Sequence, residues 1–231
     1  MSIQEHVNTV KETIAAAARA AGRDPGEITL CAATKVQTDD TIRQAIAAGI
    51  AVCGENRVQE LTAHLAAGAY AGAQVHFIGH LQTNKVKYVV GRVDLIESVD
   101  SPRLLEAVDR QAEKLGIVQD ILLEVNIGGE EAKSGFAPES LEQAAEEAKK
   151  CANVRVRGLM CIPPVAEGEH GSLPYFEKVH ALFVDINAKL YDNTLDILSM
   201  GMSGDYEDAV RAGATMVRVG TAIFGARNYT I

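Results

Sequence analysis

Tryptophan is absent from this chain of 231 residues, and cysteine is scarce. None of the four cysteines forms a C-x-x-C pair with another, so the local ligand spacing of zinc sites is missing. Three of them, Cys31, Cys53 and Cys161, fall inside apolar strand-like runs, where a thiol behaves as a small hydrophobic group. We therefore expect no metal site, buried thiols and a reducing, cytoplasmic environment.

Long apolar runs and an excess of positive charge are also missing. No segment approaches the roughly 20 consecutive apolar residues that a membrane helix needs, although 47% of the residues are hydrophobic. Lysine and arginine number 22 against 31 aspartate and glutamate residues, for a net charge of −9, and no basic stripe interleaved with aromatic residues is present. Such a chain would repel a polyphosphate backbone. We expect a globular protein that binds neither membranes nor nucleic acid.

Eight short apolar or β-branched runs alternate with helical patterns along the chain. The runs cover residues 28–34, 50–54, 74–79, 95–99, 120–126, 154–162, 195–200 and 216–220. Helical patterns cover residues 39–48, 57–67, 83–90, 102–115, 138–150, 174–190 and 205–212, and an amphipathic helix precedes the first run.

Strands that alternate with helices favour a parallel sheet, and eight units in a chain near the roughly 250 residues of a typical barrel favour closure. The prediction is an α/β protein: a single (β/α)8 TIM barrel domain over residues 1–231 with an additional N-terminal helix. An open doubly wound sheet is the alternative. Its dinucleotide-binding form is disfavoured because no G-x-G-x-x-G turn follows the first run.

Lys35 is the residue most indicative of chemistry. It directly follows the run 28–34, so it would lie at the carboxyl end of the first strand, the rim where barrels carry their active sites. An amine held there against apolar surroundings can have a lowered pKa and attack an aldehyde. A lone lysine at a strand end is more often a surface residue. A functional role for Lys35 is favoured because polar residues also follow other runs and would converge on the same mouth of the barrel. These residues are Glu55, Asn56, His80, Asp100, Asn126, Ser203 and Arg218.

Ser203 and Gly220 mark an anion site on the other side of that mouth. Ser203 stands between the seventh run and a helical pattern, where backbone N–H groups attract anions, and Gly220 and Thr221 end the last run. Together they resemble the phosphate-binding loops that barrels build after strands seven and eight. A phosphate site that faces an amine suits pyridoxal 5′-phosphate, a phosphorylated aldehyde. Lys35 would form the Schiff base, and Arg218, a permanent donor, would hold the pyridine nitrogen unprotonated.

These residues belong to motifs that match a known family almost end to end. The motifs are residues 33–35 (ATK), 54–60 (GENRVQE), 76–85 (HFIGHLQTNK), 158–160 (GLM), 198–205 (LSMGMSGD) and 218–225 (RVGTAIFG). The chain resembles the pyridoxal phosphate homeostasis proteins, whose barrel is similar to the barrel domain of alanine racemases. The resemblance implies that pyridoxal phosphate is carried on Lys35 without established turnover. The residues that it implies around the cofactor are Lys35, Asn56, Met202, Ser203, Arg218, Gly220 and Thr221.

Two further residues have less defined expected roles. His80 would be either a residue near the site or a core histidine with its hydrogen bonds satisfied. Lys133 lies in the loop that follows residues 120–126, where it would be a solvated lysine or a group that receives or releases the aldehyde. The same loop departs from the family's usual pattern in its Gly128-Gly129 pair.

The sequence favours a carrier over a catalyst. The racemases and decarboxylases with this type of barrel add a second, β-rich domain that completes their active site, whereas only a short segment follows the last expected strand here. We expect a monomer that binds pyridoxal phosphate, takes part in its homeostasis and interacts with apoenzymes that depend on it. Two alternatives remain: a one-domain racemase or lyase with the same cofactor, and a cofactor-free aldolase that uses Lys35 on a phosphosugar.

Overall fold

Eight parallel strands close into a barrel in the order in which they occur along the chain, within the residues that the structure describes. The computed structural model describes residues 2–130, 133–165, 167–168 and 170–225. The strands are β1 (Thr29–Ala33), β2 (Val52–Glu55), β3 (Gln74–Phe77), β4 (Leu95–Val99), β5 (Gln119–Val125), β6 (Val154–Cys161), β7 (Ile197–Ser199) and β8 (Met216–Val219). Pairing of β1 with β8 completes the ring, with Cys31 opposite Arg218. The predicted (β/α)8 barrel is confirmed.

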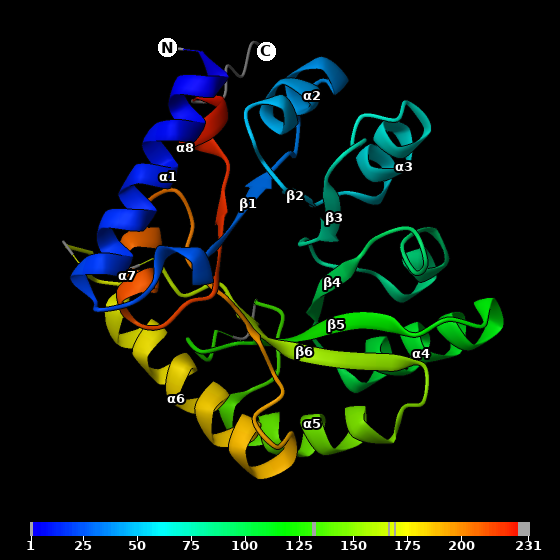
Figure 1. Cartoon of the computed structure of the whole chain (residues 1–231). Helices are drawn as coiled ribbons and strands as arrows, with labels where there is room; N and C mark the ends of the chain where they lie inside the picture. The colour runs from blue at the N-terminus through cyan, green and yellow to red at the C-terminus, as the bar shows by residue number, and fades with distance from the viewer. Residues whose placement is uncertain (1, 131–132, 166, 169, 226–231) are drawn as a thin grey trace.

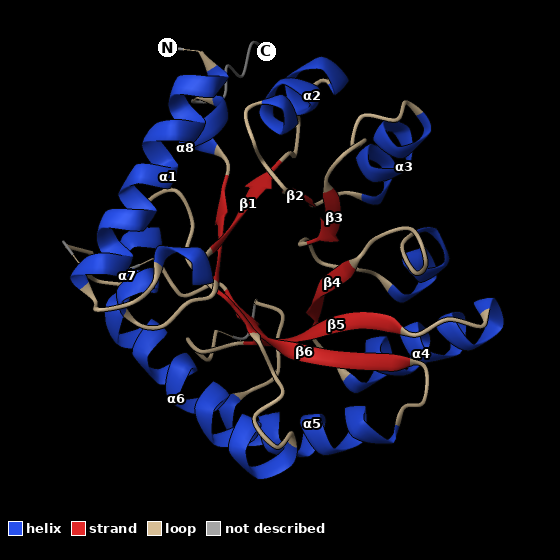
Figure 2. Cartoon of the chain, in the orientation of Figure 1, coloured by secondary structure: helices blue, strands red, loops and turns tan. Residues whose placement is uncertain are grey.

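Helices surround the ring of strands, as Figures 1 and 2 show. They are α1 (Ile3–Ala20), α2 (Asp39–Ala47), α3 (Val58–Ala66), α4 (Pro102–Leu115), α5 (Leu141–Lys150), α6 (Leu173–Leu190), α7 (Tyr206–Arg211) and α8 (Thr221–Phe224), with 3-10 turns η1 (Pro25–Glu27), η2 (Thr83–Tyr88) and η3 (Pro138–Ser140). The expected N-terminal helix is α1, which begins with a capping box formed by Ser2 and Glu5. It packs against α7 and α8.

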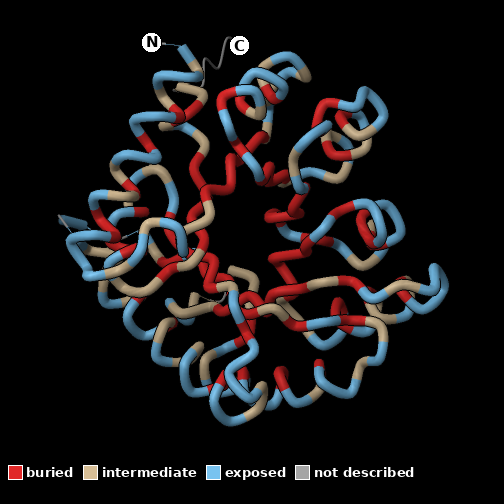
Figure 3. Tube along the Cα trace, in the orientation of Figure 1, coloured by how far each residue is buried: buried red, intermediate tan, exposed pale blue. Residues whose placement is uncertain are grey.

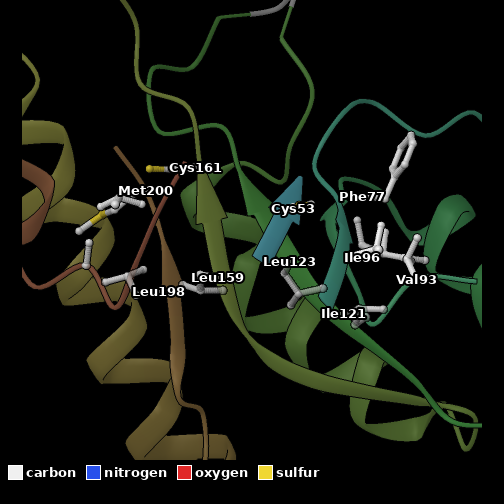
Figure 4. Packing of buried hydrophobic residues seen from close by; sticks show 14 of the residues in the cluster. Cys53, Phe77, Val93, Ile96, Ile121, Leu123, Leu159, Cys161, Leu198 and Met200 are labelled. Carbon is white, nitrogen blue, oxygen red and sulfur yellow. The ribbon is translucent and has the colours of Figure 1, made fainter. Parts of the chain in front are cut away.

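The main hydrophobic core lies between the strands and the helices that cover them. Residues that alternate along each strand, such as Leu30 and Ala32 on β1, face this layer, where Figure 4 shows part of the packing. The other residues of the strands, such as Cys31 and Ala33, form smaller apolar clusters inside the barrel. Figure 3 shows the resulting pattern, with buried residues on the inner ring and exposed residues on the outer faces of the helices.

The structure corrects three details of the expected elements. The pattern over residues 83–90 is not an α-helix but the 3-10 turn η2, which ends shortly before Gly91, a residue with φ of 75°. The segment 138–150 begins as η3 and becomes the α-helix α5 only at Leu141. The short helix α8 directly after β8 was not expected, because four residues are too few to show a helical period.

Three of the four cysteines are buried, as the sequence analysis predicts. Cys31, Cys53 and Cys161 are buried and free, and burial is the main reason that their pKa values are raised. Such thiols are poor nucleophiles at neutral pH. Over the described part of the chain, no helix is both long and apolar enough to cross a membrane.

Candidate functional site

A cavity of about 260 Å³ opens at the carboxyl ends of β1, β2 and β6 to β8. All seven residues that the sequence analysis placed around a cofactor line it: Lys35, Asn56, Met202, Ser203, Arg218, Gly220 and Thr221. They come from segments far apart in the chain that meet only because the barrel closes between β8 and β1. Apolar residues Ala33, Ile78, Ile162 and Phe224 complete much of the remaining wall. The structure therefore brings the whole expected set to one cavity.

The segment that carries Lys35 is tied to the end of β2. Thr34 is fully buried, and its hydroxyl lies 3.1 Å from the carbonyl oxygen of Gly54 and 3.3 Å from Oε2 of Glu55. Glu55 also accepts hydrogen bonds from the hydroxyl of Tyr70 and from the backbone N–H of Asn56. Burial raises the pKa of Glu55, although these hydrogen bonds partly offset the effect. These contacts fix the backbone on both sides of the cavity entrance at β1 and β2.

Asn56 presents an unusual polar atom to this region. Its side-chain oxygen Oδ1 is buried, and no described group donates a hydrogen bond to it. The backbone of Asn56 is held by close contact with Gly79, since a Cβ atom at position 79 would come within 2.2 Å of the Asn56 carbonyl oxygen. A buried acceptor without a donor costs free energy unless a bound group satisfies it. Asn56 lines the cavity, while its Oδ1 atom is an unsatisfied acceptor enclosed in the cavity wall.

The opposite wall collects N–H and hydroxyl groups. Ser203 follows β7, and its Oγ accepts hydrogen bonds from the backbone N–H groups of Gly220 at 3.2 Å and Ala222 at 3.4 Å. Asp205 holds the preceding turn by accepting the N–H of Met202 at 2.7 Å. Thr221, the first residue of α8, adds an exposed hydroxyl next to these groups. The cluster lies after strands β7 and β8, where many barrels bind phosphate, and the hydroxyls of Ser203 and Thr221 are its donors toward the cavity.

Arg218 forms the inner floor of the cavity. Its side chain is buried, with Nη1 donating to Ser199 Oγ at 2.6 Å and Nη2 donating to the Cys161 carbonyl oxygen at 2.9 Å. Glu97 lies beyond Ser199, with its Oε2 atom 3.7 Å from Nη1 of Arg218. The guanidinium group is therefore fixed in orientation and compensated in charge by residues inside the barrel.

Glu97 connects Arg218 to His76. The fully buried carboxylate accepts the Ser199 hydroxyl at 2.6 Å and lies 2.8 Å from Nδ1 of His76. Burial alone would raise the pKa of Glu97, but His76, Arg218 and Ser199 outweigh it, and the pKa is lowered. Sequence reasoning missed this network. The available signal was that His76, Glu97 and Ser199 are polar residues inside otherwise apolar strands.

The β3 to β5 side of the mouth carries a separate group of polar residues. His80 is more than half exposed, so it is not a core histidine, and its Nδ1 lies 3.0 Å from Oδ2 of Asp100 and 3.1 Å from Oγ of Ser134. Lys133 pairs with Glu130 at 2.9 Å and donates to the Pro163 carbonyl oxygen at 3.3 Å.

Two residues of β5 and its following loop complete this group. Asn126 supports the loop by donating to the carbonyl oxygens of Glu130 and Lys133. Residues 131–132 of the loop lie outside the described residues. The side chain of Glu124 is buried, and burial together with the charge of Asp100 raises its pKa to about 7. None of His80, Asp100, Asn126, Lys133 and Glu124 lines the cavity that contains Lys35.

Comparison with known proteins defines the class of this barrel. The family described as "Alanine racemase, N-terminal domain" matches residues 7–228. An alanine racemase from Clostridium difficile shares the fold, with a TM-score of 0.72 over 98% of this chain and 57% of that chain at 14% sequence identity. The fold and the family match together define a barrel of the alanine racemase N-terminal type.

More similar proteins place the chain within one group of such barrels. It is 44% identical to the pyridoxal phosphate homeostasis protein of Aquifex aeolicus, over 99% of this chain and 100% of that protein. It is 38% identical to the protein of the same name from Escherichia coli K12, over 99% of this chain and 98% of that protein. The structure of PipY from Synechococcus elongatus with pyridoxal phosphate bound has a TM-score of 0.84 at 32% identity, over 97% of this chain and 100% of that chain. The chain belongs to the pyridoxal phosphate homeostasis protein family.

Proposed function

We propose that this protein binds pyridoxal 5′-phosphate reversibly through Lys35 and takes part in the homeostasis of that cofactor inside the cell. The observation that carries the proposal is the convergence of seven residues, chosen from sequence, on one cavity of about 260 Å³. The names of the relatives and the cofactor bound to PipY agree with it. The cofactor supplies an aldehyde that condenses with a primary amine and releases water.

The chemistry of the cavity fits the three polar parts of this cofactor. The hydroxyls of Ser203 and Thr221 suit a phosphate group, because both line the same wall. The N–H groups of Gly220 and Ala222 donate to Ser203 Oγ, so the Ser203 hydroxyl hydrogen can point to the ligand. Lys35 suits the aldehyde. Arg218 suits the ring nitrogen, because it lines the same cavity and is a hydrogen-bond donor.

Arg218 would define the electronic state of the pyridine ring. Its guanidinium group only donates hydrogen bonds and does not lose its proton in proteins, so a ring nitrogen beside it stays unprotonated. Glu97 and Ser199 hold the guanidinium group in place from below. A ring with an unprotonated nitrogen withdraws electrons weakly, which disfavours the carbanion chemistry that racemases and lyases require.

The composition of the cavity favours a carrier over a racemase or lyase. Among the described residues that line it, only Lys35 and Arg218 carry ionisable side chains. Arginine is a poor acid or base at neutral pH, so one proton-transfer group, Lys35, remains. Racemisation needs a proton to leave one face of a carbon atom and another to arrive at the opposite face. A one-domain racemase or lyase is thus the second candidate, supported only by the shared fold.

Tyr206 does not supply the missing group. It follows the Ser203 turn in sequence, but its side chain is buried and does not line the cavity. Burial raises the pKa of its hydroxyl, so the tyrosine stays protonated at neutral pH. A packing role near the phosphate-binding wall accounts for its position.

The wider setting of the protein follows from the same proposal. We propose that residues 1–231 form one cofactor-binding domain, that the protein acts in the cytoplasm as a monomer, and that it exchanges its cofactor with apoenzymes that depend on pyridoxal phosphate. An open mouth with exposed Met202 and Thr221 at its rim supports exchange, because it does not enclose the cofactor.

Titration of the purified protein with pyridoxal phosphate tests the proposal. We expect a near-ultraviolet absorption band typical of a lysine Schiff base, and we expect the Lys35→Ala variant to lack it. A panel of amino acids should show no racemisation or cleavage at ordinary enzyme rates. A protein that remains colourless with excess cofactor and cleaves a phosphosugar would instead be the aldolase considered above. Rapid turnover of an amino acid would support the racemase or lyase.

A further inference from the structure

Val36, the residue directly after Lys35, has a strained backbone. Its φ angle is 64°, in the left-handed region that β-branched residues strongly disfavour. Its side chain is 61% exposed, so packing does not compensate for the strain. Left-handed conformations of bulky residues persist only where the surroundings enforce them, and they concentrate at functional sites.

Glu60, a residue outside the turn, forms a hydrogen bond with the backbone of Val36. Oε2 of Glu60, on α3, accepts the backbone N–H of Val36 at 2.7 Å. The other carboxylate oxygen accepts Nη1 of Arg57 at 3.1 Å, which fixes the orientation of the carboxylate. Within the turn, the N–H of Gln37 donates to the carbonyl oxygen of Thr34 at 3.1 Å. Lys35 is therefore held between a buried residue, Thr34, and a strained residue that is tied to a neighbouring helix.

We propose that Glu60 is a positioning residue for Lys35: its hydrogen bond to Val36 keeps the turn in the strained form that directs the lysine side chain into the cofactor cavity. This inference rests on the proposed function, because it assigns Glu60 to the same reaction of Lys35 with an aldehyde. A hydrogen bond to a charged acceptor is stronger than one between neutral groups, so a carboxylate suits the task of holding a strained turn. Without it, the turn relaxes and the amine spends less time in the reactive orientation.

If Glu60 acts by holding Val36 in its strained conformation, the effect of replacing Glu60 should depend on which residue stands at position 36. A merely structural role of Glu60 would not show this dependence. Glu60→Ala removes the acceptor, whereas Glu60→Gln keeps a side-chain oxygen that accepts the Val36 N–H. Val36→Gly removes the penalty for positive φ, so the turn depends less on Glu60 in that background. Asp40→Ala is the matched control, because Asp40 forms a comparable ion pair of i,i+3 spacing with Arg43 on α2, and its described hydrogen bond goes to Arg43 and not to the turn.

The first measurement needs no cofactor. Hydrogen exchange of the Val36 amide should be about tenfold faster in Glu60→Ala than in the unaltered protein and in Asp40→Ala, with Glu60→Gln in between. The same Val36 exchange rate in Glu60→Ala and the unaltered protein would overturn the proposal. This readout reports on the turn whether or not the protein binds pyridoxal phosphate.

The second measurement follows formation of the near-ultraviolet band after mixing with pyridoxal phosphate. We expect Glu60→Ala to slow it about tenfold, Glu60→Gln by less, and Asp40→Ala not at all. In the Val36→Gly background, Glu60→Ala should change the rate only about twofold. An equal effect of Glu60→Ala in both backgrounds would contradict positioning through strain. A band that forms in no variant, including the unaltered protein, would instead refute the proposed function, and the exchange rates alone would then decide the role of Glu60.

Discussion

Glu97 and Arg218 approach within 3.7 Å of each other inside the barrel, and the hydroxyl of Ser199 bridges them. His76 extends this network toward a second cavity, of about 800 Å³, at the amino-terminal end of the barrel, while Arg218 lines the cavity at the mouth. A buried polar network thus runs from one end of the barrel to the other. It explains how a guanidinium charge is tolerated beside the expected position of the pyridine ring.

Glu97→Gln should destabilise the protein, because it leaves the buried charge of Arg218 without compensation. We expect the free energy of unfolding to fall by about 3 kcal/mol, as for other buried pairs that lose one partner. Urea denaturation followed by circular dichroism measures the change. Ser199→Ala is the comparison, since it removes the bridging hydroxyl but keeps both charges, and it should cost about 1 kcal/mol. An equal, small effect of both substitutions would show that the charges do not depend on each other.

Glu124 should make the protein less stable as the pH rises from about 4.5 to about 7. Burial, followed by the charge of Asp100, raises its pKa from 4.5 to about 7 in the folded protein. Between these values the folded protein binds a proton that the unfolded chain has lost, so the free energy of unfolding decreases with rising pH and levels off above 7. The full effect is on the order of 3 kcal/mol. Unfolding curves in urea at a series of pH values measure it.

The matched variants for this prediction are Glu124→Gln and Glu139→Gln. The first should flatten the pH dependence over this range and raise stability at pH 8, because a neutral amide replaces a buried carboxylate. The second changes an exposed glutamate and should leave the dependence as it is. A Glu124→Gln protein whose stability still falls over the same pH range would contradict the assignment.

Asn56→Ala should affect binding and folding in different directions. Because Oδ1 of Asn56 is buried without a donor, its removal should leave the stability of the cofactor-free protein unchanged or raise it by up to about 1 kcal/mol. Affinity for pyridoxal phosphate should fall about tenfold, because Asn56 lines the cavity and the substitution removes contacts with the bound cofactor. Thermal unfolding without the cofactor and absorption titration with it provide the two readouts. A loss of stability without a loss of affinity would give Asn56 a purely structural role.

Gly158→Ala should disrupt the barrel between β6 and β7. Its φ is 155°, and a Cβ atom would lie 1.7 Å from the carbonyl oxygen of Ile197, so the two strands would have to separate. We expect a loss of about 3 kcal/mol or more, or no folding. Gly116→Ala, at a helix end with open space around it, should cost only about 1 kcal/mol. Thermal unfolding measures both losses. Similar losses would indicate that the backbone φ angle of Gly158, rather than its close contact with Ile197, sets the cost of the substitution.

The sequence predicts the barrel and the cavity well, because both follow from the order in which apolar runs and helical patterns alternate along the chain. Alternation of apolar runs with helical patterns indicates the strands and helices, and the carboxyl ends of parallel strands must meet, which brings Lys35 to Ser203 and Gly220. The network of Glu97 and His76 depends instead on which inward-facing side chains meet inside the closed barrel. No local sequence pattern shows that these two side chains come within hydrogen-bond distance.

The backbone of Val36 is also hidden from the sequence. A β-branched residue favours extended structure, so its positive φ is the opposite of what local preference indicates and becomes visible only with its contact to Glu60. The 3-10 turn η2 is missed for a related reason, because its apolar spacing over one turn resembles that of an α-helix.

Reduction of the protein by borohydride in the presence of pyridoxal phosphate, followed by peptide mapping, tests the central claim most directly. Reduction makes the link between amine and cofactor permanent, so the modified residue is identified by its mass. The account predicts that the label lies on Lys35 and that the Lys35→Ala variant takes up little or none. A label spread over surface lysines, or an unmodified Lys35 after incubation with excess cofactor, would contradict it.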